Sequence, residues 1–258
     1  MSGAITRLTH YRDLVRELVL RDIRVRYKRS VLGFAWTLAN PLLYLVVFYF
    51  VFKTALKIDI PRFGVFAFTG MVAWNWFQSS LAQGSAAIVG NRELVRSPGF
   101  PIDILPLVTV TSNLINLLVA LVVLILYQVF AGTGVHYQIV YLPLLLALQF
   151  MLILCLAYII AGINVVFRDA GHLVIVLLQL MFFMTPIFYD AKMVPEQFRT
   201  LYQLNPMVHF VEAYRSIVLG IPGINWTALS IIGVLSLLLL IYGRKLFIRH
   251  SHRFAEEV

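Results

Sequence analysis

The feature that most constrains this chain is an abrupt change from basic to apolar sequence near residue 30. Arg21–Arg29 holds five cations and one carboxylate, whereas Val31–Phe52 holds no charged residue. About 20 apolar residues suffice for a helix that crosses a bilayer, and cations favour the anionic headgroups on the cytoplasmic side of such a helix. The junction therefore predicts a membrane protein whose amino-terminal segment lies at the cytoplasmic surface.

The composition agrees with a membrane protein and argues against other classes. Of the 258 residues, 60% are apolar and 13% are charged, which is about half the charged share of a soluble domain. The net charge is +9, but the cations adjoin apolar runs rather than a polar domain, so we expect no nucleic-acid partner. The lone Cys155 excludes a disulfide within the chain. The charged first 30 residues predict no cleavable signal peptide.

Six apolar segments predict six membrane-spanning helices. They cover residues 32–56, 65–90, 104–131, 139–165, 171–189 and 226–243. The fifth ends at Met184-Thr185-Pro186 and is short enough to be broken or re-entrant. Before them, apolar residues at helical spacing predict an amphipathic helix over residues 5–30 that can lie on lipid headgroups. We expect an all-α polytopic membrane protein with an interface helix at 1–31 and one transmembrane domain at 32–258.

The distribution of cations predicts the orientation. With the amino terminus inside, the inner segments hold fifteen Lys and Arg residues and the outer segments hold six, Lys53, Lys57, Arg62, Lys192, Arg199 and Arg215. This bias places both termini in the cytoplasm. The segment 190–225 is then external, and it is too apolar for a free loop. It predicts two short helices that dip back towards the membrane.

The sequence lacks the groups that energise transport. All twelve carboxylates can be placed outside the middle of the spans, which argues against a proton- or sodium-coupled carrier. No glycine is followed by lysine, so the phosphate-binding loop G-x-x-x-x-G-K-[ST] is missing. The six histidines are scattered and predict no metal site. We therefore expect no catalytic residue, metal or cofactor in this chain, and another subunit would supply the energy for uphill transport.

Neutral polar residues lie within the spans. The second span carries Asn75, Gln78, Ser79 and Gln83, and the third carries Thr109, Ser112, Asn113 and Asn116 on one helical face. Such residues avoid lipid, so they serve hydrogen bonds between helices or line a path for a neutral, hydroxyl-rich substrate. Both explanations stay open at this point.

Aromatic residues are abundant in the first, second and fifth spans, where their rings could stack on sugars. They include Trp36, Tyr44, Phe48, Phe52, Phe77, Phe182 and Phe183. For Trp74, Trp76, Phe188 and Tyr189 an aromatic belt at the membrane interface is the favoured explanation.

The charged segment 91–103 separates the second and third spans, and its turn Ser97-Pro98-Gly99 stops a helix. This segment is a plain connector or a rigid element that transmits a push from a cytoplasmic partner.

Five motifs in order resemble the membrane subunits of type-two ABC exporters, and most closely those for O-antigen, teichoic acid and related polysaccharides. They are RDIRVRYKRSVLGFAWTLANPLL, NRELVRSPGFPIDILP, NVVFRDAGHL, MTPIFYD and LNPMVHFVEAYRSIVLG. The resemblance implies a homodimer that pairs with two copies of a nucleotide-binding subunit carrying ATP and magnesium. A lipid-linked polysaccharide would cross a bacterial inner (cytoplasmic) membrane between the two permeases. The turn SPG is less aromatic than expected at that place, which leaves the details of the ATPase contact open.

The resemblance also implies three groups of site residues. The ATPase interface would comprise Arg24, Arg26, Asn91, Arg92, Glu93, Arg96 and Phe100. The translocation path would comprise Trp36, Tyr44, Phe48, Asn75, Ser79, Asn113 and Phe183. The external gate, within residues 190–225 and next to them, would comprise Tyr189, Asn205, Pro206, Glu212 and Arg215.

Other functions remain as alternatives. A passive channel or secondary carrier would transport without nucleotide, and a structural membrane component would show no flux. Within the exporter class, teichoic acid, capsule, drug, lipid or haem export are further alternatives, because aromatic linings also suit flat apolar substrates.

Overall fold

The computed structural model describes residues 2–28, 35–55, 60–130 and 134–257, and within these ranges no strand is present. Its α-helices, in chain order, are α1 (Ser2–Tyr27), α2 (Trp36–Tyr49), α3 (Phe63–Ser85), α4 (Arg92–Val95), α5 (Ile104–Phe130), α6 (Leu142–Val166), α7 (Asp169–Phe183), α8 (Glu196–Gln203), α9 (Pro206–Leu219) and α10 (Trp226–Glu257). A π-helix, Phe50–Ala55, continues α2, and short 3-10 turns cover Val89–Asn91, Tyr137–Tyr141 and Ala191–Met193. The predicted all-α class is confirmed.

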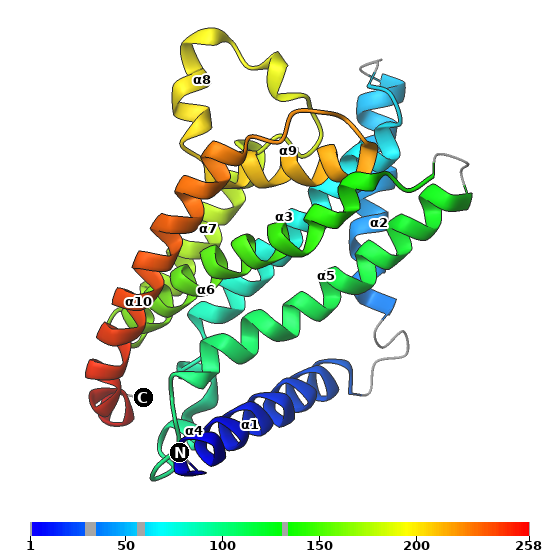
Figure 1. Cartoon of the computed structure of the whole chain (residues 1–258). Coiled ribbons are helices and arrows are strands. Elements are labelled where there is room, and N and C mark those ends of the chain that lie inside the picture. The colour runs from blue at the N-terminus through cyan, green and yellow to red at the C-terminus, as the bar shows by residue number, and fades with distance from the viewer. Residues whose placement is uncertain (1, 29–34, 56–59, 131–133, 258) are drawn as a thin grey trace.

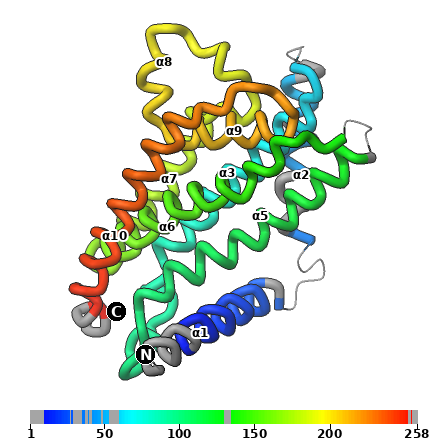
Figure 2. Tube along the Cα trace, in the orientation of Figure 1, coloured from blue at the N-terminus to red at the C-terminus, as the bar shows by residue number. Residues whose placement is uncertain are grey.

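The helices form a bundle around α3 and α6 (Figure 1). Helix α5 packs on α3, α10 packs on α6, and α9 lies across one end of the bundle against α3. Helix α1 lies along α5 at the opposite end, near α4 and the end of α10, as the backbone tube also shows (Figure 2). Both ends of the chain therefore lie on the same side of the bundle. Most of α3 is buried, and the indole of Trp74 has no exposed surface.

Each predicted span contains a helix, but several boundaries differ. Helix α3 ends at Ser85 rather than at residue 90, and α7 ends at Phe183 rather than at 189. Pro186 cannot donate the backbone hydrogen bond that a longer α7 would need, and the chain turns before it. Helix α10 runs 14 residues beyond the predicted 243, because Arg, Lys and Leu favour helix and no proline stops them.

Three of the described helical segments are long and apolar enough to cross a membrane, Ile104–Val129, Tyr137–Val166 and Trp226–Ser251. Helix α3 has the length, at 23 residues, but the polar side chains of Asn75, Gln78, Ser79 and Gln83 dilute its apolar character. The total of six crossings stays a prediction.

A polar cluster joins α1, α6 and α10 to Asp103, the residue directly before α5. Arg244 of α10 donates to the Asp103 carboxylate at 2.8 Å, and the Tyr11 hydroxyl of α1 donates to the same oxygen at 3.5 Å. The Tyr158 hydroxyl of α6 donates to the Asp103 carbonyl at 2.8 Å. Asp103 is 9% exposed, so these contacts largely replace its hydration. They fix the residue that ends the connector 91–103 against three helices.

Candidate functional site

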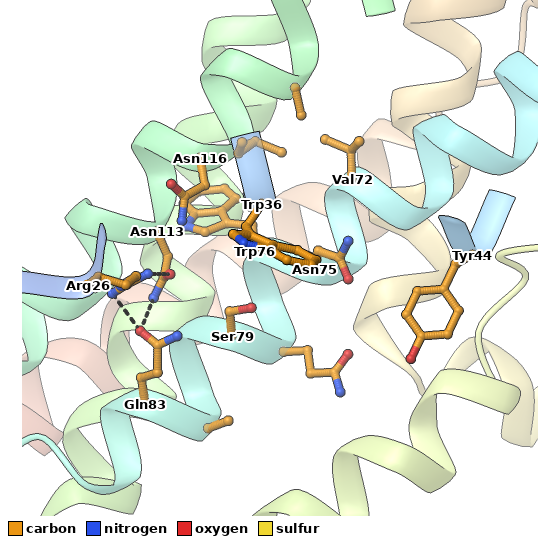
Figure 3. Close-up of a pocket in the computed structure, with 14 residues that line it drawn as sticks. Arg26, Trp36, Tyr44, Val72, Asn75, Trp76, Ser79, Gln83, Asn113 and Asn116 are labelled. Carbon is orange, nitrogen blue, oxygen red and sulfur yellow. Dashed lines mark hydrogen bonds between the residues drawn. The ribbon is translucent and has the colours of Figure 1, made fainter. Parts of the chain in front are cut away.

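A polar cavity of about 470 Å³ lies between α2, α3, α5 and the end of α1 (Figure 3). It is lined by Arg26, Trp36, Tyr44, Val72, Asn75, Trp76, Gln78, Ser79, Ala82, Gln83, Asn113, Asn116, Leu117 and Ala120. On α3 the lining runs from Val72 to Gln83, which corresponds to about 16 Å of helix at 1.5 Å per residue. This length is about half the thickness of a 30 Å hydrocarbon core.

Helical spacing explains why these residues share one cavity. On α3, Val72, Asn75, Trp76 and Ser79 follow the i, i+3, i+4, i+7 pattern of a single helix face. On α5 the same pattern relates Asn113, Asn116, Leu117 and Ala120. Because α5 packs on α3, the two faces meet and place their amides and hydroxyl groups around one space.

The chemistry of the lining is mostly neutral. Carboxamides, one serine hydroxyl, indole rings and the Tyr44 phenol dominate it, and Arg26 is the one charged residue among the described residues that line it. Amides and hydroxyls both donate and accept hydrogen bonds, and flat rings offer apolar stacking surfaces. This combination suits a neutral, hydroxyl-rich ligand, and it also suits a flat ligand with a few polar groups.

Five of the seven predicted path residues meet in this cavity, namely Trp36, Tyr44, Asn75, Ser79 and Asn113. Trp36 and Tyr44 are 44% and 57% exposed, whereas Asn113 is 1% exposed. The side chain of Phe48 lies outside what the structure describes. Phe183 does not line the cavity; it lies at the end of α7 and is 73% exposed.

The predicted path set omits several cavity residues. Gln83 and Asn116 lie on the polar faces that sequence periodicity had identified, so their position on those faces was an available signal. Trp76 also lines the cavity, and its indole donates to the Val110 carbonyl at 3.3 Å. No local pattern distinguishes Trp76 from Trp74, the other tryptophan of the same helix.

The proposed aromatic belt is wrong for three of its four residues. Trp74, Trp76 and Phe188 are 0%, 2% and 5% exposed, because they pack inside the bundle rather than at its lipid-facing surface. Trp74 contacts Phe182 edge to face with centroids 6.0 Å apart, and Phe182 contacts Phe188 at 5.8 Å. Phe52 stacks on Phe188 at 5.9 Å. These rings connect the π-helix after α2 with α3 and the end of α7.

The structure separates the predicted ATPase-interface residues into two sets. Arg24 of α1 is exposed, as are Arg92, Glu93 and Arg96 around α4, and α1 and α4 lie at the same end of the bundle (Figure 1). Asn91 accepts a hydrogen bond from Arg21 at 3.1 Å, which ties α1 to the connector. As predicted, a helix ends at the turn Ser97-Pro98-Gly99: α4 ends at Val95, directly before it, and Gly99 within the turn has φ 78°.

The other two members of this group point inward. Phe100 is half-buried and packs against the core. Arg26 lines the cavity, where its Nη1 donates to Asn113 Oδ1 at 2.8 Å and its Nη2 donates to Gln83 Oε1 at 2.7 Å. A basic residue in a cation-rich segment gives no sign of such distant partners in the sequence.

The predicted gate residues gather at the opposite end, around α9. Asn205 caps this helix by accepting from the Met207 N–H at 3.0 Å, Pro206 occupies its first turn, and the Tyr189 hydroxyl donates to the Phe183 carbonyl at 3.0 Å. Burial raises the pKa of Glu212, and the charges of His209 and Arg215 oppose that rise. The segment 190–225 does contain two short helices, α8 and α9, but their gating role stays a prediction.

Arg215 is the most buried charged residue of this group, at 5% exposed. Its Nη2 donates to the Ile187 carbonyl at 2.7 Å, its Nε donates to the Phe66 carbonyl at 3.2 Å, and its guanidinium lies 3.4 Å from the centre of the Phe66 ring. The side chain therefore joins α9 to α3 and to the turn after α7.

Among the described residues, no group of three His, Cys, Asp or Glu side chains is arranged to hold a metal.

Known proteins resemble this chain over nearly its whole length. Residues 13–219 match the ABC-2 type transporter family. The O-antigen export system permease protein RfbA of Myxococcus xanthus is 34% identical over 260 residues, which cover 100% of both chains. RfbA of Klebsiella pneumoniae is 30% identical and covers 95% of this chain and 94% of its own; the polysialic acid transport protein KpsM of Escherichia coli is 25% identical, with 90% and 92% covered. This chain belongs to the ABC-2 type transporter family.

Proposed function

We propose that this chain is the membrane permease subunit of an ATP-driven exporter that moves a lipid-linked, O-antigen-like polysaccharide across the bacterial inner membrane. The observation that carries the proposal is the cavity lined by amides, a hydroxyl and aromatic rings, with one charged residue among its described members. Sugars are recognised by such neutral groups. The names of the relatives, O-antigen export system permeases, support the same cargo class.

The energy would come from a separate nucleotide-binding subunit that binds ATP and magnesium. Two such subunits would pair with two copies of this chain, with both termini in the cytoplasm. Arg24, Arg92, Glu93 and Arg96 would contact the ATPase, which is supported by their exposure at the end of the bundle where α1 and α4 lie. Asn91 would act through its hydrogen bond with Arg21. Closure of the ATPase dimer would move α1 and the connector and open the path.

Reversal of charge at the connector tests this assignment. Arg92→Glu, Glu93→Lys and Arg96→Glu in one chain should reduce co-purification of the ATPase and its hydrolysis by about tenfold, because each change replaces attraction by repulsion across the contact. Arg199→Glu on α8 is the matched control, because it changes an exposed charge at the other end of the bundle. Unchanged assembly and unchanged stimulated hydrolysis would refute the interface.

Cargo and energy source are tested together in inside-out vesicles. Uptake of lipid-linked O-antigen should require ATP and the co-purified ATPase. Solute flux without nucleotide, from a chain that purifies alone, would instead identify a channel. Capsular polymer is the second candidate cargo, because KpsM is named for polysialic acid transport. Competition between the two polymers for uptake would distinguish them.

A further inference from the structure

A contact with the ATPase does not explain why the side chain of Arg26 points into the cavity. This residue lies in the last turn of α1, and its guanidinium reaches between α3 and α5 (Figure 3). It donates to Asn113 of α5 at 2.8 Å and to Gln83 of α3 at 2.7 Å. One side chain therefore bridges the two helices that form the walls of the cavity.

The partners of Arg26 are themselves connected. Asn113 Nδ2 donates to Gln83 Oε1 at 3.1 Å and to the Thr109 carbonyl at 3.0 Å, so Arg26, Gln83 and Asn113 form a closed triangle. Asp22, one turn earlier on α1, accepts from Arg26 Nη2 at 2.8 Å and balances its charge. Hydrogen bonds that involve an ion are stronger than neutral ones, and a planar guanidinium holds several acceptors in a fixed geometry.

The triangle lies at one end of the cavity. Gln83 is the lining residue of α3 nearest the end of that helix where α1 and α4 lie, whereas Val72 marks the opposite limit. Helix α1 is tied to the connector at two further points, by Tyr11 to Asp103 at 3.5 Å and by Arg21 to Asn91 at 3.1 Å. Movement of α1 relative to α3 and α5 would therefore have to break the contacts of Arg26.

We propose that Arg26, Gln83 and Asn113 form a latch that closes the cavity towards the cytoplasm. Arg26 is a positioning residue in this device: it holds the end of α1 across the mouth of the cavity and is withdrawn when α1 moves. The closed latch does not depend on the identity of the cargo. It rests on the proposed function for its orientation towards the cytoplasm and for the ATPase that displaces α1.

Accessibility of a cysteine inside the cavity tests the latch. Ser79→Cys in a Cys155→Ala chain, co-expressed with its ATPase in inside-out vesicles, is labelled with a membrane-impermeant maleimide. Arg26→Gln should speed labelling about tenfold, because loss of ionic hydrogen bonds of this kind shifts a closed–open equilibrium by at least that factor. Arg16→Gln is the matched control, because it removes an exposed cation from the same helix.

Equal labelling rates in Arg26→Gln, Arg16→Gln and the parent would overturn the latch. Gln83→Met provides a second variant, in case Arg26→Gln folds poorly: it removes the acceptor from an exposed position, keeps the side-chain length, and should also speed labelling. Gel filtration of each variant separates a loss of folding from a change in access, since a merely structural role would lower the folded yield without faster labelling.

Addition of a non-hydrolysable ATP analogue separates the latch from the proposed function. If both hold, the analogue speeds labelling of the parent and changes little in Arg26→Gln, whose latch is already open. Fast labelling of Arg26→Gln with no response to nucleotide in the parent would keep the latch and contradict ATP-driven opening. Nucleotide-dependent labelling of the parent that persists unchanged in Arg26→Gln would contradict the latch alone.

Discussion

A single side chain, Arg215, holds three parts of the molecule together at the end of the bundle where α9 lies. Its guanidinium satisfies two buried carbonyls, on Phe66 and Ile187, and lies over the Phe66 ring. A buried cation is costly without such partners, and arginine suits the position because its planar group donates in several directions at once. Gly70 makes the approach possible, since a Cβ there would lie 3.1 Å from Arg215 Nη2.

Arg215→Lys should therefore destabilise the protein although it keeps the charge. A compact ammonium group cannot reproduce both hydrogen bonds of the guanidinium, and an unsatisfied buried carbonyl costs about 1–3 kcal/mol. The melting temperature of the detergent-purified protein measures the loss. Arg199→Lys, whose half-exposed side chain pairs with Glu196 at 3.5 Å, should melt as the parent does. Equal melting temperatures of the two variants would show that the guanidinium of Arg215 contributes nothing to stability beyond its charge.

At the scale of the element, α9 is defined by its two ends. Asn205 and Pro206 begin it with a side-chain cap and a proline in the first turn. Gly220 ends it with φ 70°, a left-handed conformation that glycine adopts at little cost. The same glycine also faces the ring of His136 so closely that a Cβ would lie 2.5 Å from it.

Gly220→Ala should lower stability by about 1–3 kcal/mol from backbone strain alone, and the contact with His136 adds to that loss. Thermal unfolding in detergent gives the measurement. Gly64→Ala in α3 is the control, because a Cβ at that position meets nothing within 4 Å and alanine favours helix. If the two variants unfold at the same temperature, the conformation of Gly220 is not a constraint.

The elements themselves were largely predictable, because hydrophobic length and spacing act within one helix. The second and third spans and the turn at Ser97-Pro98-Gly99 follow from such local patterns, and so does the polar face that carries Asn75 and Ser79. Burial of Trp74 did not follow, because an aromatic residue near a helix centre suits both lipid and protein neighbours. The contact of Arg26 with Asn113 joins residues 87 positions apart, and helical spacing predicts contacts only between residues a few positions apart.

At the scale of the whole molecule, the two ends of the bundle differ in what they expose. Helix α1, the connector with α4 and the basic end of α10 lie together, and α8 and α9 lie at the other end (Figure 1). The excess of cations at the first end favours the cytoplasmic side. This arrangement requires an even number of crossings between α1 and the end of α10.

Single cysteines at exposed positions of each end should report opposite sides of the membrane. In a Cys155→Ala chain, we expect Arg199→Cys on α8 to react with an impermeant maleimide in spheroplasts, and Arg249→Cys on α10 to react in inside-out vesicles. The unaltered chain, whose one cysteine Cys155 is buried, should remain unlabelled in both preparations. Reaction of both cysteines from the same side would contradict the predicted orientation.

The length of α10 has a consequence for what meets the cytoplasmic end. Its 32 residues extend about 48 Å, whereas the hydrocarbon core of a bilayer is about 30 Å thick, so α10 is longer than one straight crossing needs. Arg244 holds the second half of α10 on Asp103. Phe254 near the end of α10 is 3% exposed and packs on Phe247 with ring centroids 5.1 Å apart, so this end stays against the bundle beside α4. A subunit that docks on α1 and α4 would therefore meet α10 as part of the same surface.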